Sequence, residues 1–196
     1  MRIIRLYLHA RISQALLAAF LVASLTGLPD VARADQTDPR LDRLFAVLHT
    51  SRDERELDVA QSLIWDIWIT HNDHKVARLM RRGIFAMANA RNDDALHIFD
   101  EIIAAVPDYA EAWNKRATLY FRLGDIEKAR ADVERTLELE PRHFGALSGL
   151  GQIELLRGDR EGALRAFEYA LDTNPHLTGA QQIVKRLRSK RTGFSF

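Results

Sequence analysis

The stretch from Ala110 to Pro141, AEAWNKRATLYFRLGDIEKARADVERTLELEP, fits neither the alternation of a β-strand nor the period of one amphipathic helix. An aromatic residue, a glycine, an alanine and a final proline follow one another at Trp113, Gly124, Ala129 and Pro141. Glycine is favoured in a tight turn and proline cannot continue a helix. The stretch therefore predicts two helices joined by a short turn.

The same landmarks recur at a constant interval on both sides of this stretch. The recurring positions are Ala95, Ala129 and Ala163; Phe99, Val133 and Phe167; and Pro107, Pro141 and Pro175. A further series, on the first helix of each unit, consists of the small residues Gly83, Ala117 and Gly151. A period of about 34 residues with these landmarks resembles the tetratricopeptide repeat family. The register is good from Asp73 to Ser189 and weaker back to Pro39.

The resemblance implies an all-α fold, a right-handed α-solenoid of antiparallel helix pairs with about nine helices. Small residues allow the two helices of a unit to approach closely, and the aromatic residues fill the space between units. The predicted parts are a degenerate helix pair at 35–72 that caps the stack, three units within 73–175 (about 76–109, 110–143 and 144–177), a closing helix at 176–191 and a disordered tail at 192–196.

Residues 1–34 have the pattern of a secretory signal peptide. Three arginines precede the apolar stretch Ala15–Leu25, and Ala32 and Ala34 frame a cleavage site before Asp35. The apolar stretch is shorter than the roughly 20 residues of a membrane span, although an uncleaved anchor remains the alternative. We therefore expect export across the inner membrane, a bacterial periplasmic location and no stable membrane span after cleavage.

Composition and motifs argue against several classes of function. The 196 residues have a formal net charge of +1 and no cysteine, which gives no support for nucleic-acid binding and excludes disulfides and thiol catalysis. No nucleophile motif or phosphate-binding loop is present. The cluster HNDH at His71–His74 is interpreted as a turn in which Asn72 or Asp73 caps the next helix. We predict no catalytic residue, no metal site and no cofactor.

By the resemblance, certain positions on the first helix of each unit line the concave surface of the solenoid. The predicted partner-binding residues are Met80, Ile84, Met87, Asn114, Thr118, Phe121, Arg122, Ser148 and Gln152. Methionine offers an adaptable apolar contact surface, but for Met80, Ile84 and Met87 packing under the long helix of the first unit is the alternative. Family members that clasp a C-terminal carboxylate use Lys and Asn at such positions, and this sequence does not reproduce that arrangement.

Basic residues suggest a second kind of contact. The candidates for anion binding are Arg81, Arg82 and Lys115. Arg116 occupies a position where leucine is usual and is predicted to pair with Asp132 on the second helix of its unit. Ile98 stands in the place equivalent to Asp132 for Arg82, which therefore lacks such a partner.

These features predict an exported protein–protein interaction module, an adaptor that binds a peptide or protein of the cell envelope in its concave groove. The alternative is a self-associating envelope scaffold, in which the exposed edge of the solenoid or the Trp-rich first unit builds a homo-oligomer. A stable dimer that buries Trp65 and Trp68 would favour this alternative. An enzyme is not expected.

The export prediction is tested at the N-terminus of the secreted protein. We expect the mature chain to begin at Asp35, because Ala32 and Ala34 provide the small residues that a signal peptidase reads. Intact-mass measurement of the exported protein would show it. A product that retains Ala15–Leu25 would contradict cleavage and favour the anchor.

Overall fold

The computed structural model describes residues 36–192, with side chains through Ser189. The predicted signal peptide at residues 1–34, its cleavage site before Asp35 and the predicted tail beyond Thr192 lie outside the described residues.

The described residues form nine α-helices and no strand. The helices are α2 Arg40–Thr50, α3 Glu54–Ile69, α4 His74–Ala88, α5 Asn92–Ala105, α6 Ala110–Leu123, α7 Ile126–Leu139, α8 Phe144–Leu156, α9 Arg160–Thr173 and α10 Thr178–Thr192. The prediction of an all-α solenoid is confirmed.

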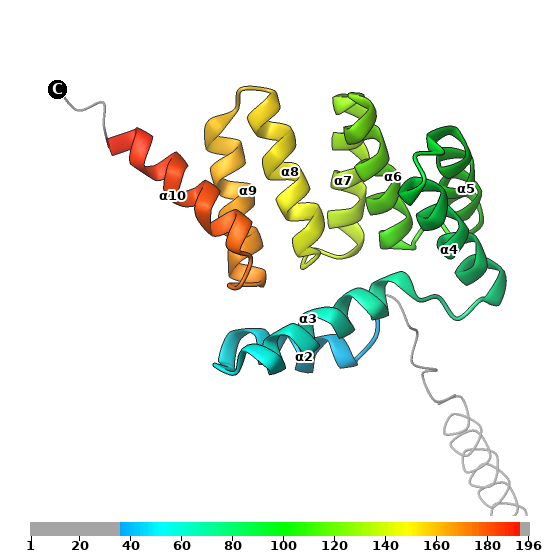
Figure 1. The fold of residues 1–196 in the computed structure, drawn as a ribbon, viewed down its shortest axis with the longest axis horizontal. Helices are drawn as coiled ribbons and strands as arrows, with labels where there is room; N and C mark the ends of the chain where they lie inside the picture. Colours follow the sequence, from blue (N-terminus) through cyan, green and yellow to red (C-terminus); the bar gives the residue numbers. More distant parts are fainter. Residues whose placement is uncertain (1–35, 193–196) are drawn as a thin grey trace, which may run out of the picture. The chain divides into compact units, whose positions relative to one another are not determined.

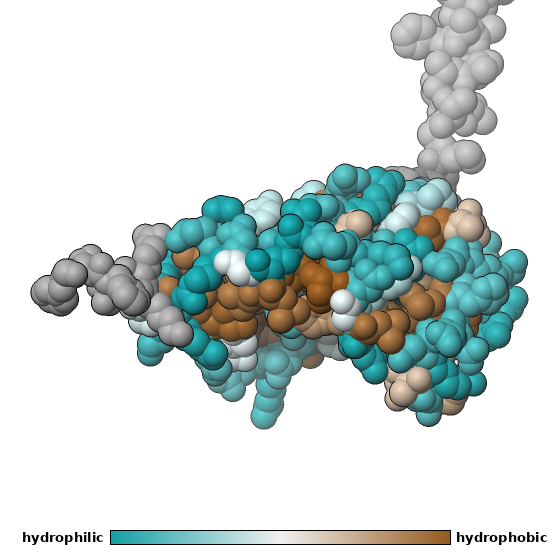
Figure 2. All heavy atoms as spheres, turned by 90° about the horizontal axis from the view of Figure 1, so that it is seen from above, coloured by the Kyte–Doolittle hydropathy of each residue, from teal (hydrophilic) through white to brown (hydrophobic). Residues whose placement is uncertain are grey.

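Three antiparallel helix pairs, α4–α5, α6–α7 and α8–α9, stand side by side, and α10 packs on α9 at the end (Figure 1). The second helix of each pair also packs on the helix that follows it: α5 on α6, α7 on α8 and α9 on α10. Seen from above, apolar residues form a band between hydrophilic margins (Figure 2), as expected for a core enclosed between two layers of helices.

The two helices of each pair are closest where a small residue faces a larger one. A Cβ atom on Gly83 would lie 2.7 Å from the Phe99 ring, and one on Gly151 would lie 2.6 Å from the Phe167 ring. In the middle pair the equivalent residues are Ala117 and Val133, which share a buried cluster. The extra methyl group on the first helix is thus matched by a smaller side chain on the second.

The predicted stacking of the N-terminal helix pair is wrong. Instead of capping α4–α5, helices α2 and α3 run across the ends of the following helix pairs (Figure 1). Side chains from three successive inter-unit loops hold them there: Tyr109 donates a hydrogen bond to the Ile69 carbonyl, His143 stacks on Trp68, and Asn174 donates to Gln61. A 16-residue helix is about 24 Å long, which suffices to cross loops spaced by roughly one helix diameter.

The loop after α3 explains this departure. The residues directly after α5, α7 and α9 share one backbone conformation, with φ between −139° and −135° and ψ between 77° and 98°. They are Val106, Glu140 and Asn174, and a proline follows each of them. Thr70, which ends α3, has φ −84° and ψ 143° and is followed by His71. The chain therefore enters α4 from a different direction, although the loop has the same length as the other three.

The close approach at Gly151 makes a stability prediction. We expect Gly151→Ala to lower the free energy of unfolding by about 1–3 kcal/mol, because the new methyl group would overlap the Phe167 ring. Combining it with Phe167→Val reproduces the small-residue pair of the middle unit, so the double variant should lose less than the sum of the two single changes. Denaturant unfolding of the four proteins measures this coupling; strictly additive losses would contradict it.

Candidate functional site

A pocket of about 170 Å³ opens between α6 and α8. Polar and apolar side chains from both helices form its sides, and buried apolar residues of α6, α7 and α8 form its floor. The lining residues are Asn114, Ala117, Thr118, Phe121, Val133, Gly145, Ser148, Gly149, Gln152 and Ile153. Five of the nine residues predicted for the groove therefore meet in one cavity.

The accessible groups of this pocket come from four side chains. Thr118 and Gln152 are exposed, whereas Phe121 and Ser148 are half-buried. The hydroxyl groups of Thr118 and Ser148 donate to backbone carbonyls one turn earlier, and both oxygens can still accept a hydrogen bond. The pocket can thus present one aromatic face together with amide and hydroxyl groups to a bound segment.

Two predicted groove residues belong to the core instead. Met80 is 0% exposed and Met87 is 8% exposed, and both pack in the cluster formed by α4, α5 and α6. Of α3, the last residue, Ile69, is partly buried against that cluster, so the two methionines are covered mainly by α4, α5 and α6. Ile84 lies half-buried against the same cluster, and exposed Arg122 reaches the Met87 carbonyl at 3.4 Å.

Helix α3 borders the pocket between α6 and α8 at Gly145. The Trp65 ring lies against Gly145, at 2.5 Å from the position that a Cβ there would take. Trp68 stacks on His143 with ring centroids 4.1 Å apart, and both side chains are buried. Trp68 is buried and Trp65 is half-buried within the chain, so the Trp-rich first unit does not offer both rings to a second copy.

A buried polar network stabilises the joint between α3 and the solenoid, where Trp65 and Trp68 pack on the start of α8 and the loop before it. Glu111, in the first turn of α6, accepts hydrogen bonds from Asn114 at 2.8 Å and His143 at 2.9 Å, and pairs with Lys115 at 2.8 Å. Burial by itself raises the pKa of Glu111, but the Lys115 charge and the His143 hydrogen bond outweigh it and lower this pKa to about 2. The repeat pattern did not predict this network. Its one signal in the sequence is an acidic residue at a repeat position that holds Ala77 and Gly145 in the other units.

The three predicted anion contacts do not form one site. Lys115 lies over the Trp65 ring and pairs with Glu111, at the joint with α3. Arg81 and Arg82 line a separate pocket between α4 and α5. The Lys115 ammonium group is thus already used inside the protein and is not available with the two arginines.

The predicted pairing of Arg116 is confirmed. Its guanidinium group binds both oxygens of Asp132 at 2.7 and 2.8 Å, and also Asp100 of the preceding unit at 2.7 Å. The two carboxylates help to raise the pKa of Arg116 even though burial opposes them, the Asp132 hydrogen bond being the largest contribution. Arg116 therefore joins three helices, which is a structural role.

The histidine turn also has a structural explanation. Asp73 caps α4 by accepting from the backbone N–H groups of Lys75 and Val76, which confirms the predicted cap. The His71 ring packs against Tyr109. Residues 36–192 contain no cluster of three or more metal-binding side chains, and no helix in that range is long and apolar enough to span a membrane.

The chain is similar in sequence to known tetratricopeptide repeat proteins. The profile of a family described as tetratricopeptide repeat matches residues 80–135 and 114–177. A TPR repeat-containing protein of Rhizobium etli is 43% identical over 157 residues, which are 79% of this chain and 76% of that protein. The small glutamine-rich tetratricopeptide repeat-containing protein 2 of Saccharomyces cerevisiae is 31% identical over 98 residues, 50% of this chain and 28% of that protein.

A solved structure has the same fold. The first TPR of Spaghetti (RPAP3), bound to the HSP90 peptide SRMEEVD, has a TM-score of 0.58 and 21% sequence identity. The similarity covers 62% of this chain and 96% of that chain. At this identity the comparison supports the arrangement of helices only.

The lowered pKa of Glu111 predicts acid sensitivity at the joint with α3. A carboxyl group whose pKa falls from 4.5 to about 2 on folding contributes stability above pH 4.5, and this contribution is lost as the pH falls to about 2. The loss would reach about 3 kcal/mol. We expect Glu111→Gln to be less stable at neutral pH and to show a flatter pH dependence in this window.

Urea unfolding followed by circular dichroism at several pH values measures this effect. Asp58→Asn is the matched control, because Asp58 is an exposed carboxylate on α3. A Glu111→Gln variant with the parental slope between pH 4.5 and 2 would contradict the prediction.

Proposed function

Because the chain belongs to the tetratricopeptide repeat family, we propose that it is a protein-binding module that holds a segment of a partner in the concave pocket between α6 and α8. Tetratricopeptide domains mediate protein–protein interactions, and some bind peptides. Such proteins are generally interaction modules and not enzymes.

The observation that carries the proposal is the convergence of the predicted groove residues. Asn114, Thr118 and Phe121 on α6 meet Ser148 and Gln152 on α8 around one cavity. Residues one repeat apart on successive first helices keep the same spacing, which suits an extended segment that crosses both helices. Phe121 would supply apolar contact, and Gln152 and Thr118 would hydrogen-bond the backbone of the segment.

The chemistry of the pocket favours an uncharged segment. The buried amide of Asn114 donates to Glu111 and is thereby held inside the protein. The lining contains no lysine or arginine, so a terminal carboxylate would find no cation there. The SRMEEVD peptide in the RPAP3 complex is that protein's ligand, and we do not propose the same ligand class for this pocket.

Because residues 1–34 have the pattern of a secretion signal, we propose an exported, periplasmic adaptor whose partner belongs to the cell envelope. The self-associating scaffold is the weaker proposal, since Trp65 and Trp68 of the first unit pack within the chain, which leaves the exposed edge of the solenoid as its proposed contact.

The groove proposal is tested by capture of an envelope partner. We expect Phe121→Ala with Gln152→Ala to weaken capture at least tenfold, because truncating central contacts commonly costs on the order of 2 kcal/mol. Since Phe121 is half-buried and Gln152 exposed, the variant should remain folded. Quantitative pull-down from envelope extract, with circular dichroism of each protein, provides the measurement.

Leu123→Ala with Gln182→Ala is the matched control, because it removes one exposed apolar residue and one exposed amide away from the pocket. The control should capture the partner as the parent does. Equal capture by the groove variant and the parent would show that the partner binds elsewhere.

A further inference from the structure

The outer face of the α4–α5 pair corresponds to the surface on which, in the later units, the preceding repeat packs. Among the described residues, no repeat packs on it. On α6 and α8, the equivalent residues Leu119 and Ile153 are 0% and 1% exposed. Leu119 shares a cluster with apolar residues of α5, the second helix of the preceding unit. Phe85 holds the same position on α4, one repeat before Leu119, and is 60% exposed.

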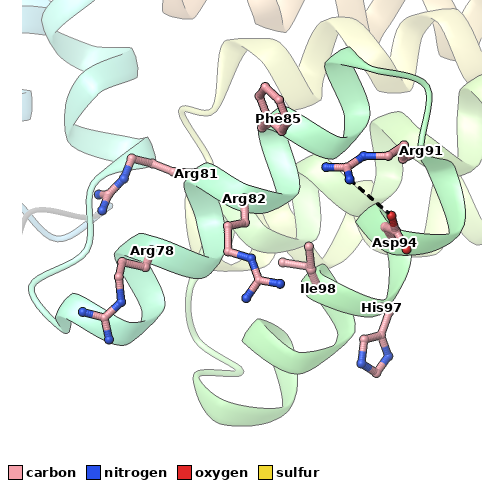
Figure 3. A pocket seen from close by; sticks show the side chains of 8 residues that line it. All are labelled: Arg78, Arg81, Arg82, Phe85, Arg91, Asp94, His97 and Ile98. Carbon is pink, nitrogen blue, oxygen red and sulfur yellow. Dashed lines mark ion pairs between the residues drawn. The ribbon is translucent and has the colours of Figure 1, made fainter.

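This face is also strongly basic. A pocket of about 520 Å³ lies on it between α4 and α5 (Figure 3). Its lining residues are Arg78, Arg81, Arg82, Phe85, Arg91, Asp94, His97 and Ile98. Asp94 is the one carboxylate in this lining, and it lies 3.8 Å from Arg91. Arg78, Arg81 and Arg82 are all exposed, and none of them forms an ion pair with a described residue, Asp94 included.

The equivalent arginine of the next unit indicates which contacts Arg82 lacks. Arg116, one repeat after Arg82, is bound by Asp132 of its own unit and by Asp100 from the preceding second helix. For Arg82, the residue equivalent to Asp132 is Ile98, which carries no charge. The residue equivalent to Asp100 would be Asp66, on the helix α3 that crosses the loops instead of stacking here.

We propose that this face docks an acidic amphipathic helix of a partner protein, in the position that α5 occupies against α6. A carboxylate of that helix would bind Arg82 as Asp100 binds Arg116, and an apolar residue would cover Phe85. Arg78 stands where α6 and α8 have alanine, so the face selects for a helix with additional negative charge. Residues 1–35 carry four arginines and two aspartates, which makes them a poor match.

The chain provides a probe of the required chemistry. A peptide with the sequence of α5, NDDALHIFDEIIAA, carries four acidic residues and includes Asp100. Held helical by a hydrocarbon staple and labelled with a fluorophore, it can be titrated with the full-length protein and followed by fluorescence anisotropy. We expect saturable binding that weakens with added salt.

Arg78→Glu with Arg82→Glu should weaken binding at least tenfold, because it replaces attraction by like-charge repulsion at the centre of the face. Lys185→Glu with Arg186→Glu on α10 is the matched control with the same change in net charge, and both of its residues are exposed. The control should bind within about twofold of the parent. Circular dichroism of both variants confirms that they are folded.

Several outcomes would overturn the proposal. These are an absence of saturable binding, equal affinity of the parent and the Arg78→Glu, Arg82→Glu variant, or an equal loss in the α10 control. Sedimentation of the protein alone tests whether a second copy of this chain binds to the face. Self-association that the Arg78→Glu, Arg82→Glu variant abolishes would mean that a second copy of this chain, and not a different acidic helix, covers the face.

Discussion

The contact between a residue with little or no side chain on one helix and a larger side chain on the next sets the spacing on which the structure depends. At Gly83 and Gly151 the aromatic ring of the second helix occupies the space in which a Cβ would lie. Because the pairs share this fit, successive units present their inter-unit loops at regular intervals. Those loops, through Tyr109, His143 and Asn174, form the row of contacts on which α3 lies.

The joint between α3 and the solenoid also defines the groove. Glu111, whose carboxylate is buried, connects the start of α6 to the loop before α8 through His143. A buried carboxylate is costly unless its oxygens are paired, so the network favours one position of α3 over other apolar contacts of similar area. The same helices continue past this joint to line the open pocket, which therefore begins where α3 ends its contact.

Arginine at one repeat position has different roles in different units, depending on what lies next to it. Arg116 is enclosed by two carboxylates and stabilises the junction of two units. Arg82 occupies the same position at the start of the stack, where no described helix supplies an equivalent carboxylate and the side chain is exposed. The chemical type of the residue is the same, and the neighbouring unit determines whether it acts inside the protein or on its surface.

The sequence by itself determined the features that depend on local spacing. The repeat period predicted the helix pairs, the pairing of Arg116 with Asp132 and half of the pocket lining, because all of them lie within one unit or repeat between adjacent units. The turn residues at His71–His74 predicted a cap at Asn72 or Asp73. Only the tertiary structure decided where α3 lies, since that depends on the backbone at Thr70 and on contacts between residues far apart in the chain, such as Asn174 with Gln61. The depth of burial of Met80 was likewise decided by tertiary packing, because a helix position fixes the direction of a side chain but not the thickness of the layer that covers it.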